Sequence, residues 1–310
     1  SQAYEPCDEE QGIRTLNAVL DMGYDHLDTA ALYGFGKNEE LLNKAIGHRR
    51  SEYFLASKCG LYRDATGKRE INGRPEVLTK TCEDSLRRLG TDCIDLYYLH
   101  RIDLNVPVED SIGALINMRD QGKIRFIGLS EPSPETLEKA LNLCQIAAVQ
   151  SELSLWTRSP NDTVADICGR KGIAFVSYSP LGRGFFGGKV RDTAVLTEKD
   201  IRHTMPRFQA DNFASNLKRL DELSALADEN GITVAQLALA WVMAQGDHIL
   251  AIPGTRFEDR ARENLDAARS LLTDEVIAHA GRIVSPESTA GERWTETILR
   301  EVDSEQNRFR

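Results

Sequence analysis

Residues 124–144 read "IRFIGLSEPSPETLEKALNLC" and combine the two patterns that decide the fold. The first seven residues form a short, largely apolar run of strand length that ends at Ser130. Ser133 then suits the N-cap of a helix, and Pro134 suits its first position. The stretch therefore predicts one strand followed by one helix.

The same strand-then-helix unit recurs on both sides of this stretch. Strands that alternate with helices indicate a parallel sheet whose outer side is covered. One more helix is predicted before the first strand, over residues 8–22. The strands are predicted at 25–29, 53–58, 93–100, 124–130, 146–150, 173–179 and 248–255. The helices after them are predicted at 38–46, 75–90, 108–122, 133–144, 163–172, 216–231 and 260–268, with an additional helix that opens with a capping box of Thr233 and Gln236.

Seven strands, each followed by a helix, indicate an eight-fold β/α (TIM) barrel of the α/β class whose first strand is missing from this N-terminus. We expect that residues belonging to that strand are absent from the sequence, and a barrel without it would expose two sheet edges. No linker or shift in composition divides the chain. We therefore expect a single domain over residues 1–310.

Composition excludes several function classes. The chain has 310 residues and a formal net charge of −10, which argues against general nucleic-acid binding because that requires a basic surface. No apolar stretch approaches the roughly 20 residues of a membrane helix, and the acidic N-terminus has no signal core. The cysteines are scattered without a CxxC pair, which is typical of reduced thiols and predicts a cytoplasmic protein with no metal site.

Polar groups stand at the end of every predicted strand. In a β/α barrel the carboxyl ends of the strands meet at one mouth, where active sites lie. Each group alone would be read as a turn or a helix cap. Turn formation or helix capping alone does not explain why an acid, an amine and an imidazole stand together at neighbouring strand ends. The groups are Asp28, Lys58, His100, Ser130, Gln150, Tyr178 and the turn Pro253-Gly254-Thr255.

Four of these side chains suggest carbonyl chemistry. A free tyrosine is a poor proton donor at neutral pH, but a nearby ammonium group stabilises phenolate. Lys58 would supply that charge to Tyr33, and Asp28 would keep the lysine charged and in place. A neutral His100 would orient a carbonyl oxygen. The set can polarise and protonate a carbonyl but offers no strong nucleophile, so a cofactor hydride is the natural incoming group.

The sequence "GRGFFG" (182–187) matches the dinucleotide pattern GxGxxG. We reject a Rossmann fold because Pro180 intervenes, no apolar-striped helix follows the glycines, and only one clear strand remains. In a barrel, however, the loops after the last two strands often bind phosphate. Residues 179–189 would then place glycine amides, Arg183 and Lys189 near a pyrophosphate.

The last strand leads to a second candidate phosphate site. Arg256 and Arg260 are four residues apart and share a helix face if the helix already includes Arg256. Guanidinium groups beside a helix N-terminus favour a phosphate dianion, such as the additional phosphate of NADP. The alternative is a solvated helix whose acidic residues balance these charges.

With these motifs in order, the sequence resembles the aldo-keto reductase superfamily from "DEEQG" (8–12) to "ENLDAA" (263–268). The resemblance rests on "HLDTAALYG" (26–34), "LASKCG" (55–60), "DLYYLHR" (95–101), "IGLSE" (127–131), "VQSELS" (149–154), "SYSPLGRGFFGGK" (177–189) and "IPGT" (252–255) with "REN" (262–264). It implies an NADP(H)-binding barrel in which Tyr33 is the proton donor, Lys58 and Asp28 tune it, and His100 orients the carbonyl. For the cofactor it implies Ser130, Glu131 and Gln150 at the carboxamide, Tyr178 against the nicotinamide, Ser179, Pro180, Leu181, Gly182, Arg183 and Lys189 at the pyrophosphate, and Gly254, Thr255, Arg256, Arg260, Glu263 and Asn264 at the adenosine end.

One position departs from the family. Many members have asparagine where this chain has Glu131, and a carboxylate can accept a hydrogen bond from the carboxamide but cannot donate one. The resemblance implies NADPH-dependent reduction of small aldehydes, and of some ketones. We expect specificity to be set by loops, especially the loop at residues 61–74, by Trp156 and by the C-terminal segment around Trp294. An NADP-binding, channel β-subunit-like interaction protein with little turnover stays open as an alternative. A metal-dependent barrel hydrolase using Asp28 and His100 is a weaker one.

Overall fold

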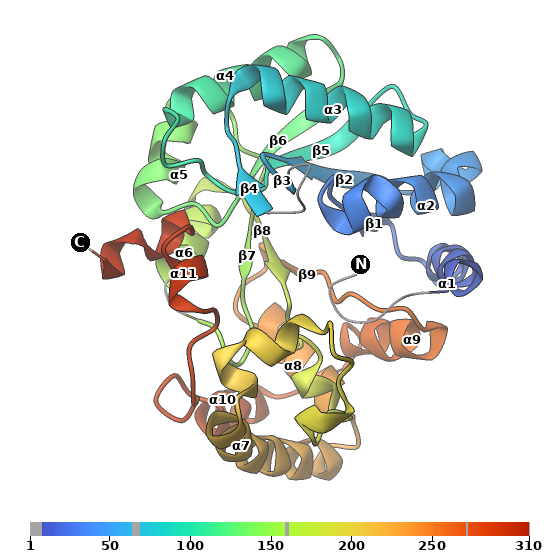
Figure 1. The fold of residues 1–310 in the computed structure, drawn as a ribbon. Coiled ribbons are helices and arrows are strands. Elements are labelled where there is room, and N and C mark those ends of the chain that lie inside the picture. Colours follow the sequence, from blue (N-terminus) through green and yellow to red (C-terminus); the bar gives the residue numbers. More distant parts are fainter. Residues whose placement is uncertain (1–7, 64–68, 159–160, 271, 310) are drawn as a thin grey trace.

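The computed structural model describes residues 8–63, 69–158, 161–270 and 272–309. Its centre is a curled parallel sheet with helices on the outer side (Figure 1). Seven strands of the described residues pair in the order β1-β2-β5-β6-β7-β8-β9. The predicted α/β barrel is thereby confirmed. The strands are β1 (His26–Asp28), β2 (Phe54–Cys59), β5 (Ile94–Leu99), β6 (Ile124–Ser130), β7 (Ala148–Glu152), β8 (Ala174–Tyr178) and β9 (Ile249–Ala251).

The helices begin where the sequence provides caps. Ser133 accepts a hydrogen bond from the Thr136 amide at the start of α5, and Thr233 and Gln236 form the predicted capping box of α8. The apolar stripe of α7 faces the core, where Leu220 and Leu223 are fully buried. The predicted helices correspond to α1 (Glu9–Asp21), α2 (Lys37–Ile46), α3 (Pro75–Leu89), α4 (Val108–Asp120), α5 (Pro134–Leu141), α6 (Asn161–Lys171), α7 (Ala210–Glu229), α8 (Val234–Met243) and α9 (Glu258–Ala267).

Within the described residues, the seven-stranded sheet has two end strands. Strands β1 and β9 are the ends of the sheet, and within the described residues no pairing joins them. A hollow of about 390 Å³ opens at the amino ends of the strands, with Phe54, Phe126 and Leu250 among its lining residues. This end of the barrel lies opposite the strand ends that carry the predicted site.

Two parts of the chain differ from the sequence prediction. Residues 61–74, predicted as a loop, contain an antiparallel pair of strands, β3 (Leu61–Arg63) and β4 (Arg69–Ile71). The helix at 260–268 was predicted to be the last, but α10 (Asp274–Ile283) and α11 (Glu296–Leu299) follow it. Thr273 caps α10 by accepting a hydrogen bond from the Val276 amide.

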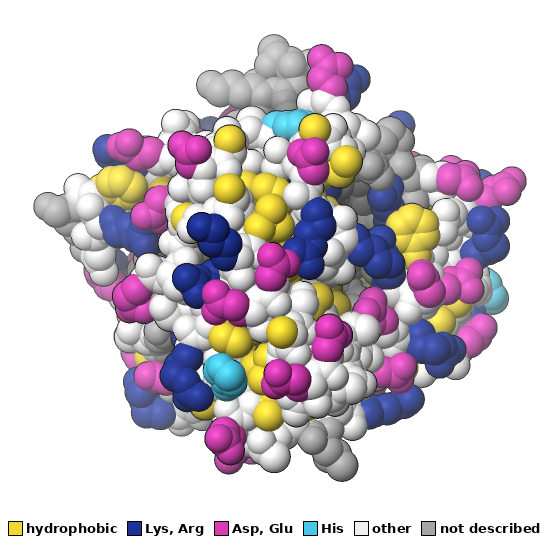
Figure 2. All heavy atoms as spheres, turned by 90° about the horizontal axis from the view of Figure 1, so that it is seen from below, with side chains coloured by type: hydrophobic (Ala, Val, Ile, Leu, Met, Phe, Trp, Pro, Cys, Tyr) yellow, Lys and Arg dark blue, Asp and Glu magenta, His cyan; other side chains and the backbone are white. Residues whose placement is uncertain are grey.

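The described surface carries charges of both signs. Acidic and basic side chains are interspersed over the face shown in Figure 2. Among the helices of the described residues, none is both long and apolar enough to span a membrane.

Candidate active site

The structure brings the four predicted catalytic side chains together at the carboxyl ends of three neighbouring strands. Asp28 ends β1, Lys58 lies near the end of β2, and His100 directly follows β5. Strand register places Asp28 beside Ala56 and Lys58 beside Tyr98. Because β1, β2 and β5 are adjacent in the sheet, residues far apart in the sequence converge here.

Lys58 is a completely buried cation with a fixed set of partners. Its ammonium group pairs with Asp28 and donates a hydrogen bond to the Thr29 carbonyl at 2.8 Å. Gln150 donates to the other oxygen of Asp28 at 2.8 Å. Burial alone would lower the pKa of Lys58, but Asp28 and then Tyr33 outweigh it, so the pKa is raised. The lysine therefore stays protonated.

Tyr33 reaches this pair from a tight turn after β1. The Tyr33 amide donates to the Ala30 carbonyl at 2.9 Å, and the next two residues, Gly34 and Phe35, adopt left-handed backbone conformations. The Lys58 ammonium lies 5.1 Å from the centroid of the Tyr33 ring. The Tyr33 and His100 rings stand edge to face, with centroids 6.0 Å apart. Phenol, amine and imidazole thus form one cluster.

His100 is held in the neutral state. Burial lowers its pKa well below the usual histidine value, and the nearby cations Arg101, Lys58 and Arg69 lower it further. Its amide donates to the Cys59 carbonyl at 2.8 Å, which fixes the start of the loop after β5. A neutral imidazole can donate a hydrogen bond to a carbonyl oxygen without adding a full charge.

The predicted carboxamide-binding residues lie at the ends of the next strands. Ser130 ends β6 and accepts a hydrogen bond from Arg101 at 3.2 Å, while Gln150 in β7 is bound to Asp28. The Tyr178 hydroxyl, at the end of β8, donates to Glu131 at 2.9 Å. Glu131 follows β6 with a φ of 55°, a conformation that a non-glycine residue rarely adopts. The structure thus places this set beside the predicted catalytic side chains.

The predicted pyrophosphate loop, residues 179–189, is tightly folded where it follows β8. Ser179, Gly182 and Arg183 all have a positive φ. A Cβ atom on Gly182 would come within 2.9 Å of the Trp156 ring, so only glycine fits there. The glycines open no α-helix: between β8 and α7 the described helical segments are short 3-10 turns. Within this loop Pro180 is buried, Leu181 is partly buried and Lys189 is exposed.

The adenosine-end residues surround the start of α9. This helix begins at Glu258, so Arg256 lies outside it and the condition for sharing a helix face with Arg260 is not met. Both guanidinium groups instead lie near the Phe257 ring, 5.5 Å from its centroid for Arg256 and 5.2 Å for Arg260. The Thr255 hydroxyl accepts a hydrogen bond from the Phe257 amide at 3.1 Å. The remaining predicted residues of this end are Gly254, which is exposed, Glu263, which is partly buried, and Asn264, which is buried.

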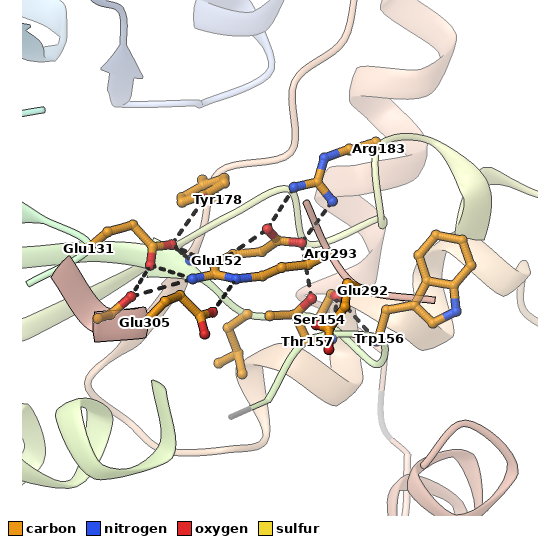
Figure 3. A network of polar contacts seen from close by, with 12 residues as sticks. Glu131, Glu152, Ser154, Trp156, Thr157, Tyr178, Arg183, Glu292, Arg293 and Glu305 are labelled. Carbon is orange, nitrogen blue, oxygen red and sulfur yellow. Dashed lines mark hydrogen bonds and ion pairs between the residues drawn. The ribbon is translucent and has the colours of Figure 1, made fainter. Parts of the chain in front are cut away.

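A buried ionic network beside these residues was not anticipated. Arg293 pairs with Glu131, Glu152 and Glu305, and Arg183 forms two hydrogen bonds to Glu152 (Figure 3). These five side chains are at most 3% exposed. In a sequence, charged residues of this kind are normally assigned to the surface. The two hydrogen bonds from Arg293 to Glu131 join positions 162 residues apart, so no local sequence pattern predicts them.

Three further residues have definite places. Trp156 was expected to influence specificity, but it is 4% exposed and stacks on Phe185 with ring centroids 4.0 Å apart. It therefore belongs to the interior. Trp294 lies under the Arg183 guanidinium, 4.2 Å from its Cζ. Cys59 is fully buried, and burial raises the pKa of its thiol.

No group of three or more potential metal ligands is assembled among the described residues.

Comparison with known proteins places the whole arrangement in a family. The model of the aldo/keto reductase family matches residues 1–284. The chain is 38% identical to a probable aldo-keto reductase of Glycine max, covering 94% of this chain and 84% of that protein. It is also 38% identical to the aldo-keto reductase yakc [NADP(+)] of Schizosaccharomyces pombe, covering 94% and 87%.

Solved structures agree with the sequence relatives. A glycerol dehydrogenase from Gluconobacter oxydans superimposes with a TM-score of 0.83 at 31% identity, over 92% of this chain and 89% of that one. An aldo/keto reductase from Klebsiella pneumoniae in complex with NADP and acetate gives 0.69 at 28% identity, also over 92% and 89%. The strand-end cluster, the barrel and these relatives lead to one conclusion. The chain belongs to the aldo/keto reductase family.

Proposed function

We propose that this chain, acting as one barrel domain, reduces small aldehydes and some ketones to alcohols with NADPH. As a member of the aldo/keto reductase family it is an oxidoreductase. The observation that supports the finer reaction is the convergence of Asp28, Tyr33, Lys58 and His100 at one barrel mouth. This set can activate a carbonyl oxygen and contains no strong nucleophile, which favours reduction over hydrolysis.

Each of the four side chains has a distinct role in this proposal. Tyr33 holds the proton that passes from its hydroxyl to the carbonyl oxygen. Lys58, charged and fixed by Asp28, stabilises the negative charge that develops on Tyr33 as the proton leaves. His100 is neutral and donates a hydrogen bond that orients the substrate oxygen.

The residues around the mouth fit NADP. The named relatives include an NADP(+) enzyme and a complex with NADP. Here Arg256 and Arg260 bring two cations to the start of α9, where the helix dipole also favours a phosphate. The left-handed turn at Ser179–Arg183 would hold the pyrophosphate, and Tyr178 would cover the nicotinamide. When bound, NADPH supplies the hydride that adds to the carbonyl carbon.

The two arginines near α9 should set the preference for NADPH over NADH. We expect Arg256→Gln/Arg260→Gln to weaken NADPH binding by at least about tenfold, because charge-assisted hydrogen bonds to the extra phosphate are lost. NADH binding should change by less than about threefold. Fluorescence titration with both nucleotides measures this, and Arg262→Gln, exposed on the same helix, is the matched control. Equal weakening of both nucleotides would contradict this role.

The proposed reaction is tested by a panel of aldehydes and ketones. The purified protein should consume NADPH, followed by its absorbance, with several small aldehydes, and a metal chelator should leave the rate unchanged. If NADPH binds tightly but no carbonyl in the panel is reduced, the reaction is wrong. The interaction-protein alternative is then favoured, and capture of a membrane partner becomes its test.

A further inference from the structure

We infer that Arg293 is a positioning residue that joins the C-terminal segment, residues 291–309, to the cofactor site. Through Glu131 it fixes Tyr178, and through Glu152 it fixes Arg183 (Figure 3). The inference rests on the proposed NADPH-dependent function, because Tyr178 and Arg183 are the residues predicted to contact the nicotinamide and the pyrophosphate.

The Glu131 carboxylate is fully hydrogen-bonded to donors inside the protein. It accepts hydrogen bonds from the Tyr178 hydroxyl at 2.9 Å, the Glu152 amide at 2.9 Å and the Ser304 hydroxyl at 2.7 Å. Arg293 donates two more, at 3.0 and 2.9 Å. A carboxylate offers about four lone-pair sites, so these five donors use its capacity. Glu131 therefore has no lone pair left for the carboxamide, and its effect on the cofactor site passes through Tyr178.

The positive charge of Arg293 offsets the cost of burying the carboxylates of Glu131, Glu152 and Glu305. Its side chain is 3% exposed, its Nε donates to Glu305 at 2.7 Å, and its guanidinium lies 3.6 Å from Glu152. Burial alone would raise the pKa of Glu131, but Arg293 holds it well below the usual glutamate value. The pKa of Glu152 is lowered in the same way, against burial, by Arg183 and Arg293. Both acids thus stay ionised inside the protein.

The second branch of the network reaches the loop after β8. Glu152 accepts hydrogen bonds from Arg183 at 2.9 and 2.7 Å, which hold the guanidinium against the barrel. The same guanidinium lies over the ring of Trp294, which is the residue next to Arg293 in the chain. The loop residue is thus held between a barrel strand and the C-terminal segment.

The C-terminal segment has its own anchors on the same strand end. The Ser304 amide donates to the Glu131 carbonyl at 3.2 Å, and Asp303 accepts a hydrogen bond from the Ser133 amide at 2.6 Å. The segment is therefore fixed beside the cofactor site independently of Arg293. Loss of the guanidinium should change how Tyr178 and Arg183 are held more than where the segment lies.

The test compares NADPH binding and turnover in Arg293→Met, Arg293→Lys and Arg300→Met. Arg300 lies on the same segment in an exposed pair with Glu296 and serves as the control. We expect both Arg293 variants to bind NADPH at least about tenfold more weakly, with kcat at saturating NADPH within about threefold of the wild type. Arg300→Met should match the wild type.

The pH dependence of NADPH affinity distinguishes a specific positioning role of Arg293 from a general loss of structure. Without Arg293, the Arg101 cation and the Glu152 amide still lower the pKa of Glu131 against its burial, but the largest opposing cause is gone, so this pKa should rise. The NADPH affinity of Arg293→Met, measured from about pH 5 to 8, should therefore depend on pH. In the wild type Glu131 stays ionised across this range and contributes no such variation. A flat profile in a folded Arg293→Met would contradict the inference.

If Arg293→Met does not fold, the double variant Arg293→Met/Glu131→Gln is the second test. It removes the cation together with one of its acids, and it leaves Glu152 paired with Arg183 and Glu305 paired with Arg308. Weakened NADPH binding by this double variant supports the inference, and unchanged binding overturns it. Unchanged binding by a folded Arg293→Met also overturns it. Failure of the wild type itself to bind NADPH would refute the proposed function instead, so the two failures are distinguishable.

Discussion

Replacing Lys58 with methionine is expected to lower kcat for aldehyde reduction by at least about 100-fold and to destabilise the protein by about 3–5 kcal/mol. Both effects arise from one buried charge. Lys58 is 0% exposed, and its partner Asp28 is 8% exposed at the side chain. Methionine has a similar length but leaves Asp28 without the Lys58 cation, while Gln150 still donates a hydrogen bond to it.

The double variant Lys58→Met/Asp28→Asn separates folding from chemistry. Removing both charges should recover most of the lost stability, because no uncompensated buried charge remains. It should not recover turnover, because Tyr33 still lacks the ammonium group that stabilises it as its proton leaves. Urea unfolding measures the first effect and NADPH consumption the second. Normal turnover by either variant would remove Lys58 from the proposed site.

Periodic parts of the fold were predictable from the sequence because local patterns determine them. The caps at Ser133 and Thr233 lie where their hydroxyls satisfy helix amides, and the seven apolar runs became the seven described strands of the barrel. The β3–β4 pair escaped prediction because each strand is three residues long and carries charged residues. Helix α10 was not predicted because the first residues of this helix are polar and resemble a loop unless Thr273 is recognised as its N-cap.

The site was partly predictable for a related reason. Residues such as Asp28, Lys58 and His100 end neighbouring strands, so the parallel topology alone brings them together. Whether Arg256 shares a helix face with Arg260 stayed open in the sequence, because it depended on where α9 begins, and sequence patterns place a helix end only within a few residues. Arg293 was missed because its partner Glu131 lies 162 positions away and no periodic pattern connects them.

The sharpest test of the proposed reaction is the single-turnover rate of NADPH oxidation in Tyr33→Phe. Phenylalanine keeps the ring that faces His100 and lies near the Lys58 ammonium, and it removes only the hydroxyl that carries the proton. The matched control is Tyr53→Phe, which directly precedes β2 at the opposite end of the barrel. Fluorescence titration first establishes that all three proteins bind NADPH with dissociation constants within about twofold of one another.

Each NADPH-loaded protein is then mixed rapidly with the best aldehyde from the panel, and the loss of NADPH absorbance is followed. We predict that Tyr33→Phe oxidises NADPH at least about 100-fold more slowly than the wild type and Tyr53→Phe, since its general acid is gone. A Tyr33→Phe rate within about threefold of the wild type, with NADPH bound equally well, would contradict the central claim that this phenol protonates the carbonyl.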